Sequence, residues 1–350
     1  MQHKSKKYLF FISQDYSFPI LRPLQEIIWQ KGDEVQWFMY GDEIHKDYIL
    51  SNEKVLQHIE EVVAYKPDVV FVPGNVVPSF ISGLKVEIFH GLPSNKQRKN
   101  GQNYHYIIRS MFDLYATQGP SSTKVFNLLV KKYQFFSVAE TGWTKLDPLF
   151  SEPTPSKDNT KKSIFFASTF SPRFSKAKIL YPFLVEFIQK HDYHWYITLH
   201  PKMHHEIIKK YKGIQLPNVT FVLPIDVIPY MKKADIMLGD TSSIIYEFLM
   251  QHKPVVTFQT EKEIPYVTNV SDLKDLEKAL INRLNSTEKL PNELIKMINE
   301  IHPYRDGHSS LRLINSVEKM LQGENLPTKK KPLNLFRNFK LRRELSYWKF

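Results

Sequence analysis

Three adjacent hydroxyl side chains, Thr241, Ser242 and Ser243, have the types and the setting of a phosphate-binding site. The apolar run at residues 236–238 is typical of a buried strand, and Asp240 follows its end. A helix is predicted to begin at the serines, where free backbone N–H groups and the positive end of the helix dipole suit a phosphate. An ordinary serine cap without a ligand has the same pattern, so both interpretations stay open on this stretch alone.

A histidine follows another predicted strand in the first half of the chain. Residues 85–89 form that strand, and His90 opens the loop His-Gly-Leu-Pro-Ser-Asn-Lys, which ends at Lys96. A neutral imidazole can take a proton from an alcohol near pH 7, and a lysine attracts an anion. A loop histidine beside a solvated cation is the alternative, and the residues alone do not choose between the two.

A second histidine, His200, directly follows the predicted strand 194–199 and comes two residues before Lys202. A histidine and a lysine at the carboxyl end of a strand can both approach a diphosphate. Two further histidines and a glutamate at 204–206 raise the question of a metal site. No His-Glu-x-x-His pattern occurs, and zinc needs three or four convergent ligands, so we predict no metal site.

Glu247 lies one helical turn beyond Ser243, within a helix expected to run to about Gln251. Residues four apart lie on one side of a helix, so we expect the carboxylate and the serine to point the same way. A carboxylate in that position accepts hydrogen bonds from ribose hydroxyls. A solvent-facing glutamate on an amphipathic helix is the alternative.

The overall composition limits what these residues can belong to. The chain has 350 residues, 42% of them hydrophobic, which is enough for two domains with hydrophobic cores. It has no cysteine, which excludes disulfides and thiolate chemistry. The net charge of +12 predicts affinity for phosphates of nucleic acid, anionic lipid or an anionic substrate. No signal peptide and no run of about 18 apolar residues occurs, so we expect a cytoplasmic protein, soluble or peripheral to the membrane.

Two successive sets of alternating strands and helices are expected to position these residues. The alternation begins at Tyr8 and begins again at Ser163, after a polar linker at 151–162. Alternation of this kind predicts parallel sheets with crossover helices, which bind ligands at their carboxyl edge. We expect an α/β protein of two Rossmann-like domains, residues 1–150 and 151–326, facing each other across a cleft.

The end of the chain, residues 327–350, differs from both domains. Eight lysines and arginines there accompany a single acid, Glu344, and leucine and aromatic side chains are interleaved with them. A basic segment of this composition suits an anionic membrane surface. A helix docked on the protein and a solvated tail are the alternatives.

Taken in order, six motifs resemble the CDP-glycerol glycerophosphotransferases, a family that builds teichoic-acid-like and capsular polymers of glycerol phosphate or ribitol phosphate. The six motifs are His90–Lys96, Thr141–Asp147, Phe166–Phe170, Leu199–Pro201, Asp240–Phe248 and Asp306–Ser310. Each is weak alone, but six in the family's order, each at a strand end or a helix start, are fairly specific.

The resemblance implies a GT-B-like fold in which the first domain binds the acceptor and the second binds the donor nucleotide. It implies that Ser242 and Ser243 hold the donor diphosphate beside His200, and that Glu247 meets the ribose. His90 would then be the general base for a hydroxyl of a glycan or lipid-linked acceptor. That oxygen would attack the β-phosphorus of CDP-glycerol and expel CMP.

The resemblance also implies the rest of the substrate site. Phosphoryl transfer needs positioning and charge neutralisation, so neither a tightly bound metal nor another cofactor is expected. The positive charge would come from Lys96, Lys145 and Lys202. The remaining donor contacts would come from Ser168, Thr169, Asp240 and Thr241.

Two departures from the family pattern leave the donor open. Thr241 stands where tyrosine is usual, and residues 144–146 stand where Pro, Arg and Asn are common. A GT-B glycosyltransferase or an epimerase acting on a nucleotide sugar is therefore the second hypothesis, which release of CMP or UDP from candidate donors would separate from the first. A nucleic-acid-binding protein, suggested by the charge, is the third, and no recognised binding motif supports it.

Overall fold

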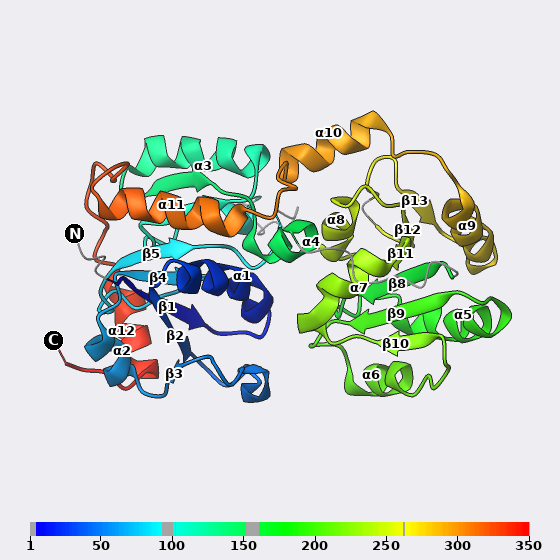
Figure 1. Ribbon diagram of the computed structural model, residues 1–350, viewed down its shortest axis with the longest axis horizontal. Helices are drawn as coiled ribbons and strands as arrows, with labels where there is room; N and C mark the ends of the chain where they lie inside the picture. The colour runs from blue at the N-terminus through cyan, green and yellow to red at the C-terminus, as the bar shows by residue number, and fades with distance from the viewer. Residues whose placement is uncertain (1–4, 93–100, 102, 152–160, 262, 350) are drawn as a thin grey trace. The chain divides into compact units, whose positions relative to one another are not determined.

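The computed structural model describes residues 5–92, 101, 103–151, 161–261 and 263–349. The chain divides into two compact units, one of Met1–Ser151 with Glu300–Phe350 and one of Glu152–Asn299. Each unit is a parallel sheet layered with helices (Figure 1). This architecture confirms the predicted α/β class of two Rossmann-like domains.

The described strands of the first unit form a seven-stranded sheet in the order β3-β2-β1-β4-β5-β6-β7. They are β1 (Lys7–Ile12), β2 (Glu34–Met39), β3 (Val55–Leu56), β4 (Val69–Val72), β5 (Leu84–Glu87), β6 (Leu114–Thr117) and β7 (Ser137–Glu140). All their pairings are parallel. The strand order reverses between β1 and β4, and sheets of this type bind ligands outside the carboxyl ends of the strands at such a point.

Helices cover this sheet and include a segment from the far end of the chain. They are α1 (Ser17–Gln30), α2 (Ile59–Tyr65), α3 (Pro120–Tyr133), α4 (Asp147–Ser151), α11 (Ser309–Leu321) and α12 (Leu335–Glu344), with short 3₁₀ turns η1 (Lys46–Tyr48), η2 (Tyr104–Tyr106) and η3 (Thr144–Leu146). Helix α11 packs against α1 and η3. Its Glu318 forms ion pairs with Lys6 at 3.0 Å and Lys31 at 3.1 Å. These contacts explain why residues 300–326, which the sequence placed with the second domain, belong to the first unit.

The described strands of the second unit form a six-stranded sheet in the order β10-β9-β8-β11-β12-β13. They are β8 (Ser163–Ser168), β9 (His194–Leu199), β10 (Val219–Phe221), β11 (Ile236–Gly239), β12 (Val255–Phe258) and β13 (Thr268–Val270). The order reverses between β8 and β11, where Ala167 pairs with Gly239. Ser168, the last residue of β8, and Asp240, the residue after β11, therefore stand beside each other at the switch point.

The remaining helices are α5 (Ala177–Lys190), α6 (His205–Lys212), α7 (Val227–Lys233), α8 (Ile244–Leu249), α9 (Leu273–Asn285) and α10 (Asn292–Ile301), with the 3₁₀ turn η4 (Pro224–Asp226). Strands β8, β11 and β12 are buried along their whole length. This burial is typical of a parallel sheet covered on both faces, and it explains their continuous apolar runs. No helix in the described part of the chain is long and apolar enough to span a bilayer.

Prediction and structure agree for the long apolar elements and differ where a strand pairs with another segment of the chain that local spacing does not reveal. The strand predicted at 194–199 is confirmed as β9, and the helices that the apolar spacing predicts at 273–285 and 309–321 are confirmed as α9 and α11. The apolar pattern of residues 55–65 predicts a single helix, which is wrong at its start, because Val55–Leu56 pairs with β2 and Trp37 N donates to Lys54 O at 2.8 Å. The helix begins only at Ile59.

Candidate active site

Asp240, the residue after β11, is the centre of a hydrogen-bonded network at the carboxyl edge of the second unit's sheet. Its side chain is fully buried. The carboxylate accepts hydrogen bonds from Ser168 Oγ, Thr169 N at 2.9 Å, Thr241 N at 2.6 Å, and Lys176 N at 3.0 Å. One side chain thus joins the loop after β8, the start of α5 and the loop after β11 at the topological switch point.

This network defines how Asp240 can act on a ligand. Burial raises the pKa of the Asp240 carboxyl, and the hydrogen bonds from its four donors act in the opposite direction. Both carboxylate oxygens already accept bonds from the protein's own donors, and Ser168 is itself only 4% exposed. We therefore expect Asp240 and Ser168 to position the loops, while a ligand contacts the groups that these loops present.

The loop Thr241–Ser243 presents such groups. Ser242 is partly exposed and Ser243 is exposed. The Ser243 hydroxyl makes no capping hydrogen bond to α8, so the interpretation as an ordinary serine cap is wrong. Thr241 Oγ1 is buried and has no hydrogen-bond partner among the described residues. Hydroxyl and backbone N–H groups of a loop are suitable hydrogen-bond donors to an anion.

The helix after this loop is shorter than predicted, because α8 ends at Leu249 and not near Gln251. A helix of fewer than two turns has a small dipole, so the loop donors would carry most of the attraction for an anion. Glu247 is 3% exposed, so the solvent-facing interpretation of this side chain is wrong. A contact between Glu247 and ribose stays a prediction.

His200 follows β9, the neighbour of β8, and its side chain is exposed. His200 N donates to Ser168 O at 3.4 Å, and the imidazole packs on Phe170 with ring centroids 4.3 Å apart. Nδ1 accepts a hydrogen bond from Lys202 N at 3.1 Å. A neutral imidazole whose Nδ1 accepts carries its proton on Nε2, so Nε2 is a hydrogen-bond donor. A phosphate oxygen is a suitable partner for it.

The lysine and histidines that follow are exposed. Lys202, His204 and His205 all lie at the surface. Within the described ranges, no group of three or more histidine and carboxylate side chains is arranged to hold a metal ion.

His90 lies in a strained loop at the carboxyl edge of the first unit's sheet. It is exposed, and its imidazole packs against Tyr16 with ring centroids 5.3 Å apart. Phe89 before it has a φ of 64°, which a bulky residue rarely adopts. Trp143 Nε1 donates to Phe89 O at 3.1 Å, and the Phe89 ring stacks on His105 at 4.4 Å. A strained backbone held by such contacts is typical of a functional loop.

Lys145 follows β7 in η3, and its Nζ lies 5.2 Å from the ring centroid of Trp143. The same indole holds the carbonyl of Phe89, so the structure brings the Lys145 segment and the His90 loop together at one edge. Lys96 lies outside the described residues. His90 and Lys145 belong to the first unit, and the other described candidates belong to the second.

The motif at 306–310 has a partner that the sequence did not reveal. The Asp147 carboxylate accepts hydrogen bonds from Ser309 N at 2.8 Å and Ser310 N at 2.7 Å. The start of α11 therefore already holds an anion supplied by the protein. Two motifs of the resemblance, 141–147 and 306–310, form one structural unit, and only a tertiary contact could show this.

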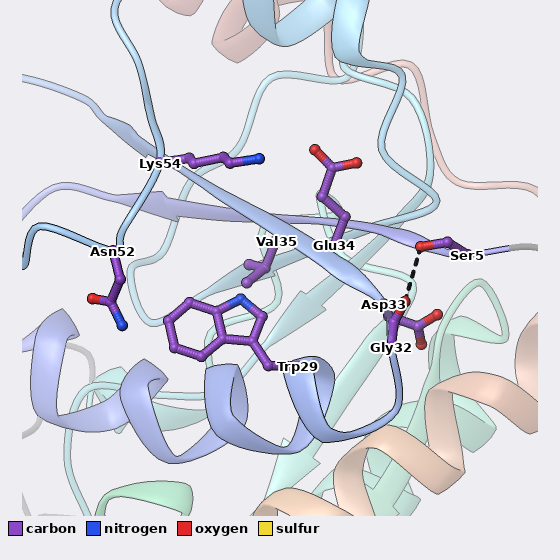
Figure 2. Close-up of a pocket in the computed structure, with 8 residues that line it drawn as sticks. All are labelled: Ser5, Trp29, Gly32, Asp33, Glu34, Val35, Asn52 and Lys54. Carbon is purple, nitrogen blue, oxygen red and sulfur yellow. Dashed lines mark hydrogen bonds between the residues drawn. The ribbon is translucent and has the colours of Figure 1, made fainter.

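A hollow of about 240 Å³ elsewhere in the first unit is not part of this arrangement. Trp29, Glu34 and Lys54 are among the side chains that line it (Figure 2), and Ser5 Oγ donates to Gly32 O at 3.3 Å beside it. It lies at the amino end of β2. Because open α/β sheets bind ligands at their carboxyl ends, we do not assign it to the active site.

The sequence pattern of the UDP-N-acetylglucosamine 2-epimerase family matches residues 42–318, well over half of the chain. The chain belongs to this family. Among solved structures, this family member is similar to the wall teichoic acid polymerase TagF, with a TM-score of 0.64 and 13% identity over 92% of this chain and 90% of TagF. It is also similar to S. aureus MnaA in a co-structure with UDP, with a TM-score of 0.60 and 17% identity over 93% and 98% of the two chains. At these identities the likeness shows a shared fold, which is of the GT-B type.

A curated relative of this 2-epimerase-family member acts in teichoic acid synthesis. It is the teichoic acid glycerol-phosphate primase of Bacillus subtilis (strain 168), 26% identical over 194 residues. The match covers 50% of this chain and 49% of the primase, so the chain spans about half the length of that relative. Teichoic acid proteins are thus among its relatives and structural neighbours, whereas the family that matches is that of the epimerases.

Glu87, the last residue of β5, is a buried carboxyl close in sequence to the His90 loop of this 2-epimerase-family member, and its protonation affects stability. It is 4% exposed, and burial raises the pKa of its carboxyl from 4.5 to about 8, against the lowering effect of Arg109. Between these two values the folded state binds more protons than the unfolded state, so the contribution of Glu87 to stability falls as pH rises. We predict that the effect of Glu87→Gln on the free energy of unfolding, relative to the wild type, is more stabilising at pH 8 than at pH 4.5. The difference between the two pH values should be on the order of a few kcal/mol.

Urea denaturation of both proteins at the two pH values measures this difference. Glu60→Gln, which removes an exposed glutamate on α2, is the matched control and should show no pH-dependent difference from the wild type. Equal effects of Glu87→Gln at both pH values would contradict the prediction.

Proposed function

We propose that this protein transfers glycerol phosphate, or a related polyol phosphate, from a CDP-linked donor to a hydroxyl of a glycan or lipid-linked acceptor in cell-surface polymer synthesis. The observation that carries the proposal is the carboxyl edge of the second unit. There, Asp240 braces a loop of hydroxyl and amide donors, and at the same edge of the sheet β9 leads to a histidine whose Nε2 is a donor. The primase relative and the TagF neighbours support the same chemistry, and one TagF structure was soaked with CDPG.

In this proposal the second unit binds the donor pyrophosphate. Ser242 and Ser243 donate to its oxygens, and Thr241 Oγ1, which lacks a partner among the described residues, turns to a phosphate oxygen or a bridging water. His200 Nε2–H donates to the same group. Lys202 adds positive charge from a position next to His200, and donors fixed before the substrate arrives need little reorganisation in the transition state.

The first unit then supplies the acceptor side of the reaction. The His90 imidazole takes the proton of the acceptor hydroxyl, and the resulting oxygen forms a bond to the β-phosphorus of the donor. The bond between that phosphorus and the oxygen bridging it to the α-phosphorus breaks, and CMP leaves with the bonding electron pair. Lys145 contributes positive charge near this edge. Proton transfer to a positioned histidine contributes about 10²–10⁴-fold to such rates.

A UDP-sugar epimerase is the second candidate function, and the family match favours it. Both candidates need a nucleoside diphosphate on the second unit, so the site residues there do not separate them. They differ in the products, because the transferase releases CMP in the presence of an acceptor whereas the epimerase changes one sugar stereocentre.

One donor experiment tests the proposal. The purified protein is incubated with CDP-glycerol, CDP-ribitol and UDP-N-acetylglucosamine, each with and without a glycerol-phosphate-primed lipid acceptor. We expect acceptor-dependent CMP release from a CDP-polyol. Epimerisation of the UDP-sugar without CMP release from either CDP-polyol would overturn the transferase function in favour of the epimerase.

The tautomer of His200 gives a prediction that distinguishes its two nitrogens. Asparagine at 200 can keep an acceptor for Lys202 N but has no donor at the Nε2 position, whereas glutamine can place an N–H there. We predict that His200→Asn weakens donor binding about tenfold and that His200→Gln weakens it by less than about threefold, since a hydrogen bond to a charged group is worth about 1.5–3 kcal/mol. Calorimetric titration with the donor measures both, and equal losses would contradict the assignment of Nε2 as the donor.

A further inference from the structure

Five large apolar side chains are exposed within one short segment at the end of the chain. They are Leu333, Leu335, Phe336, Phe339 and Trp348, with exposed fractions of 78%, 69%, 94%, 58% and 46%. The rings of Phe339 and Trp348 contact each other, with centroids 5.4 Å apart. Single exposed apolar residues are common on protein surfaces, but a cluster of this kind marks an interaction site.

The helix that carries this cluster is fixed to the first unit by its opposite side. Leu341 and Tyr347, 4% and 8% exposed, belong to the hydrophobic core of that unit, and Tyr347 stacks on Phe80 at 4.7 Å. Asn338 Oδ1 accepts a hydrogen bond from Ser79 N at 3.1 Å. The segment is therefore a docked helix and not a solvated tail, and its apolar outer side has a fixed orientation.

Exposed cations share this outer side. Phe336, Lys340 and Arg343 are four and three residues apart and lie along one side of α12, and Arg337 is exposed beside them. Lys340 is also 3.6 Å from Glu344, the single acid of the helix. The face thus combines aromatic side chains with long, flexible cations.

We propose that α12 and its flanks, residues 333–348, form a docking face for an anionic phospholipid bilayer. The helix lies parallel to the bilayer surface, with the aromatic side chains at the boundary between headgroups and acyl chains and the cations on lipid phosphates. The face holds the first unit at the membrane. This membrane-docking role goes beyond the transfer reaction and does not depend on which donor the enzyme uses.

Charge and size favour a bilayer over a protein partner. Protein interfaces are depleted in lysine at their centres, whereas lysine and arginine beside aromatic side chains are typical of membrane-surface helices. Helix α12 has 10 residues and is about 15 Å long. Its outer side is small next to the roughly 800 Å² that each partner buries in a stable dimer.

Vesicle co-sedimentation of the full chain tests the proposal. We expect binding to vesicles that contain phosphatidylglycerol and little binding to pure phosphatidylcholine. Phe336→Ser/Phe339→Ser should lower partitioning at least about tenfold, because each buried aromatic side chain contributes to interfacial affinity. Arg337→Gln/Lys340→Gln/Arg343→Gln should lower it about a hundredfold, since each charge near an anionic surface contributes about fivefold. Both variants replace exposed side chains, and circular dichroism checks their folding.

Matched controls come from α3 in the same unit. Leu128→Ser removes an exposed apolar residue, and Lys124→Gln/Lys131→Gln/Lys132→Gln removes three exposed charges, so neither should change vesicle binding. Equal binding of the wild type, the α12 variants and the controls would overturn the proposal. Conversion of a wild-type dimer to a monomer by the α12 variants, seen in analytical ultracentrifugation with unchanged vesicle binding, would replace the bilayer by a second copy of the chain.

Trp348 reports whether the face enters the lipid. Quenching of its fluorescence by lipids brominated on their acyl chains is expected in the wild type and should be lost in Trp348→Phe. Because the readout is lipid contact and not turnover, failure of the docking proposal and failure of the transfer function give different results. Identical quenching in the two proteins would place the contact elsewhere.

Discussion

Replacing His90 by alanine is expected to lower turnover of the CDP-polyol by about 10³-fold while donor affinity changes by less than about twofold. The imidazole is the group proposed to take the acceptor proton, and it stands in the first unit, whereas the proposed donor contacts come from the second. Loss of the base therefore affects the chemical step and leaves the pyrophosphate contacts in place. Steady-state rates of CMP release and calorimetric titration with the donor measure the two effects separately.

The matched control for this prediction is His45→Asn. His45 is another exposed histidine of the first unit, and its Nδ1 lies 2.6 Å from Asp15 Oδ2. Its removal should change turnover by less than about threefold, because no proton-transfer role is proposed for it. Comparable losses in both variants would mean that this edge of the sheet was disturbed as a whole. More than a few per cent of turnover in His90→Ala would show that His90 is not the base.

The second large effect is expected from Asp240→Asn, which keeps the volume of the side chain and removes its charge. The amide has one acceptor oxygen in place of two, so several of the N–H and O–H groups that now bond to Asp240 lose their partner inside the protein. We predict a loss of about 2–4 kcal/mol of stability. We also predict about 100-fold weaker donor binding, because loops displaced by about 1 Å lose productive geometry.

Asp235→Asn is the matched control, because Asp235 stands at the other end of the same strand. It precedes β11 and accepts from Ser163 N at 2.8 Å and Ser163 Oγ at 3.2 Å. The control should cost stability, by about 1–2 kcal/mol, without weakening donor binding. Thermal unfolding and donor titration of both variants make the comparison. If Asp240→Asn binds the donor as tightly as Asp235→Asn does, the loops at the switch point are not the donor site.

Several site features followed from residue type and position along the chain. Apolar runs that end in polar residues predicted β9 before His200 and β11 before Asp240, because buried parallel strands leave their carboxyl ends at one edge. These patterns predicted that His200 and the 240–243 loop would lie at the carboxyl edge of one sheet, and the family resemblance added Ser168. The hydrogen bonds and strand register of these residues agree with a shared edge.

Other features of the site depend on contacts between distant residues. The left-handed backbone of Phe89 is held by Trp143, more than fifty residues away, and no local pattern signals it. The N–H groups at the start of α11 donate to the Asp147 carboxylate, and Asp147 lies 162 residues before Ser309 in the chain. The burial of Glu247 depends on what packs over α8, and helical spacing left a solvent-facing side chain open as an alternative.

Residue types and their spacing were enough to predict the fold class, most strands and long helices, and the residues gathered at each carboxyl edge. These follow from local hydrophobic patterns and from the fixed polarity of parallel sheets. Three features became visible only in the folded protein: residues 300–350 complete the first unit, Asp240 braces loops with a fully bonded carboxylate, and α12 docks with its aromatic side outward. Local periodicity does not encode such features, because burial and hydrogen-bond partners are set by segments far apart in the chain.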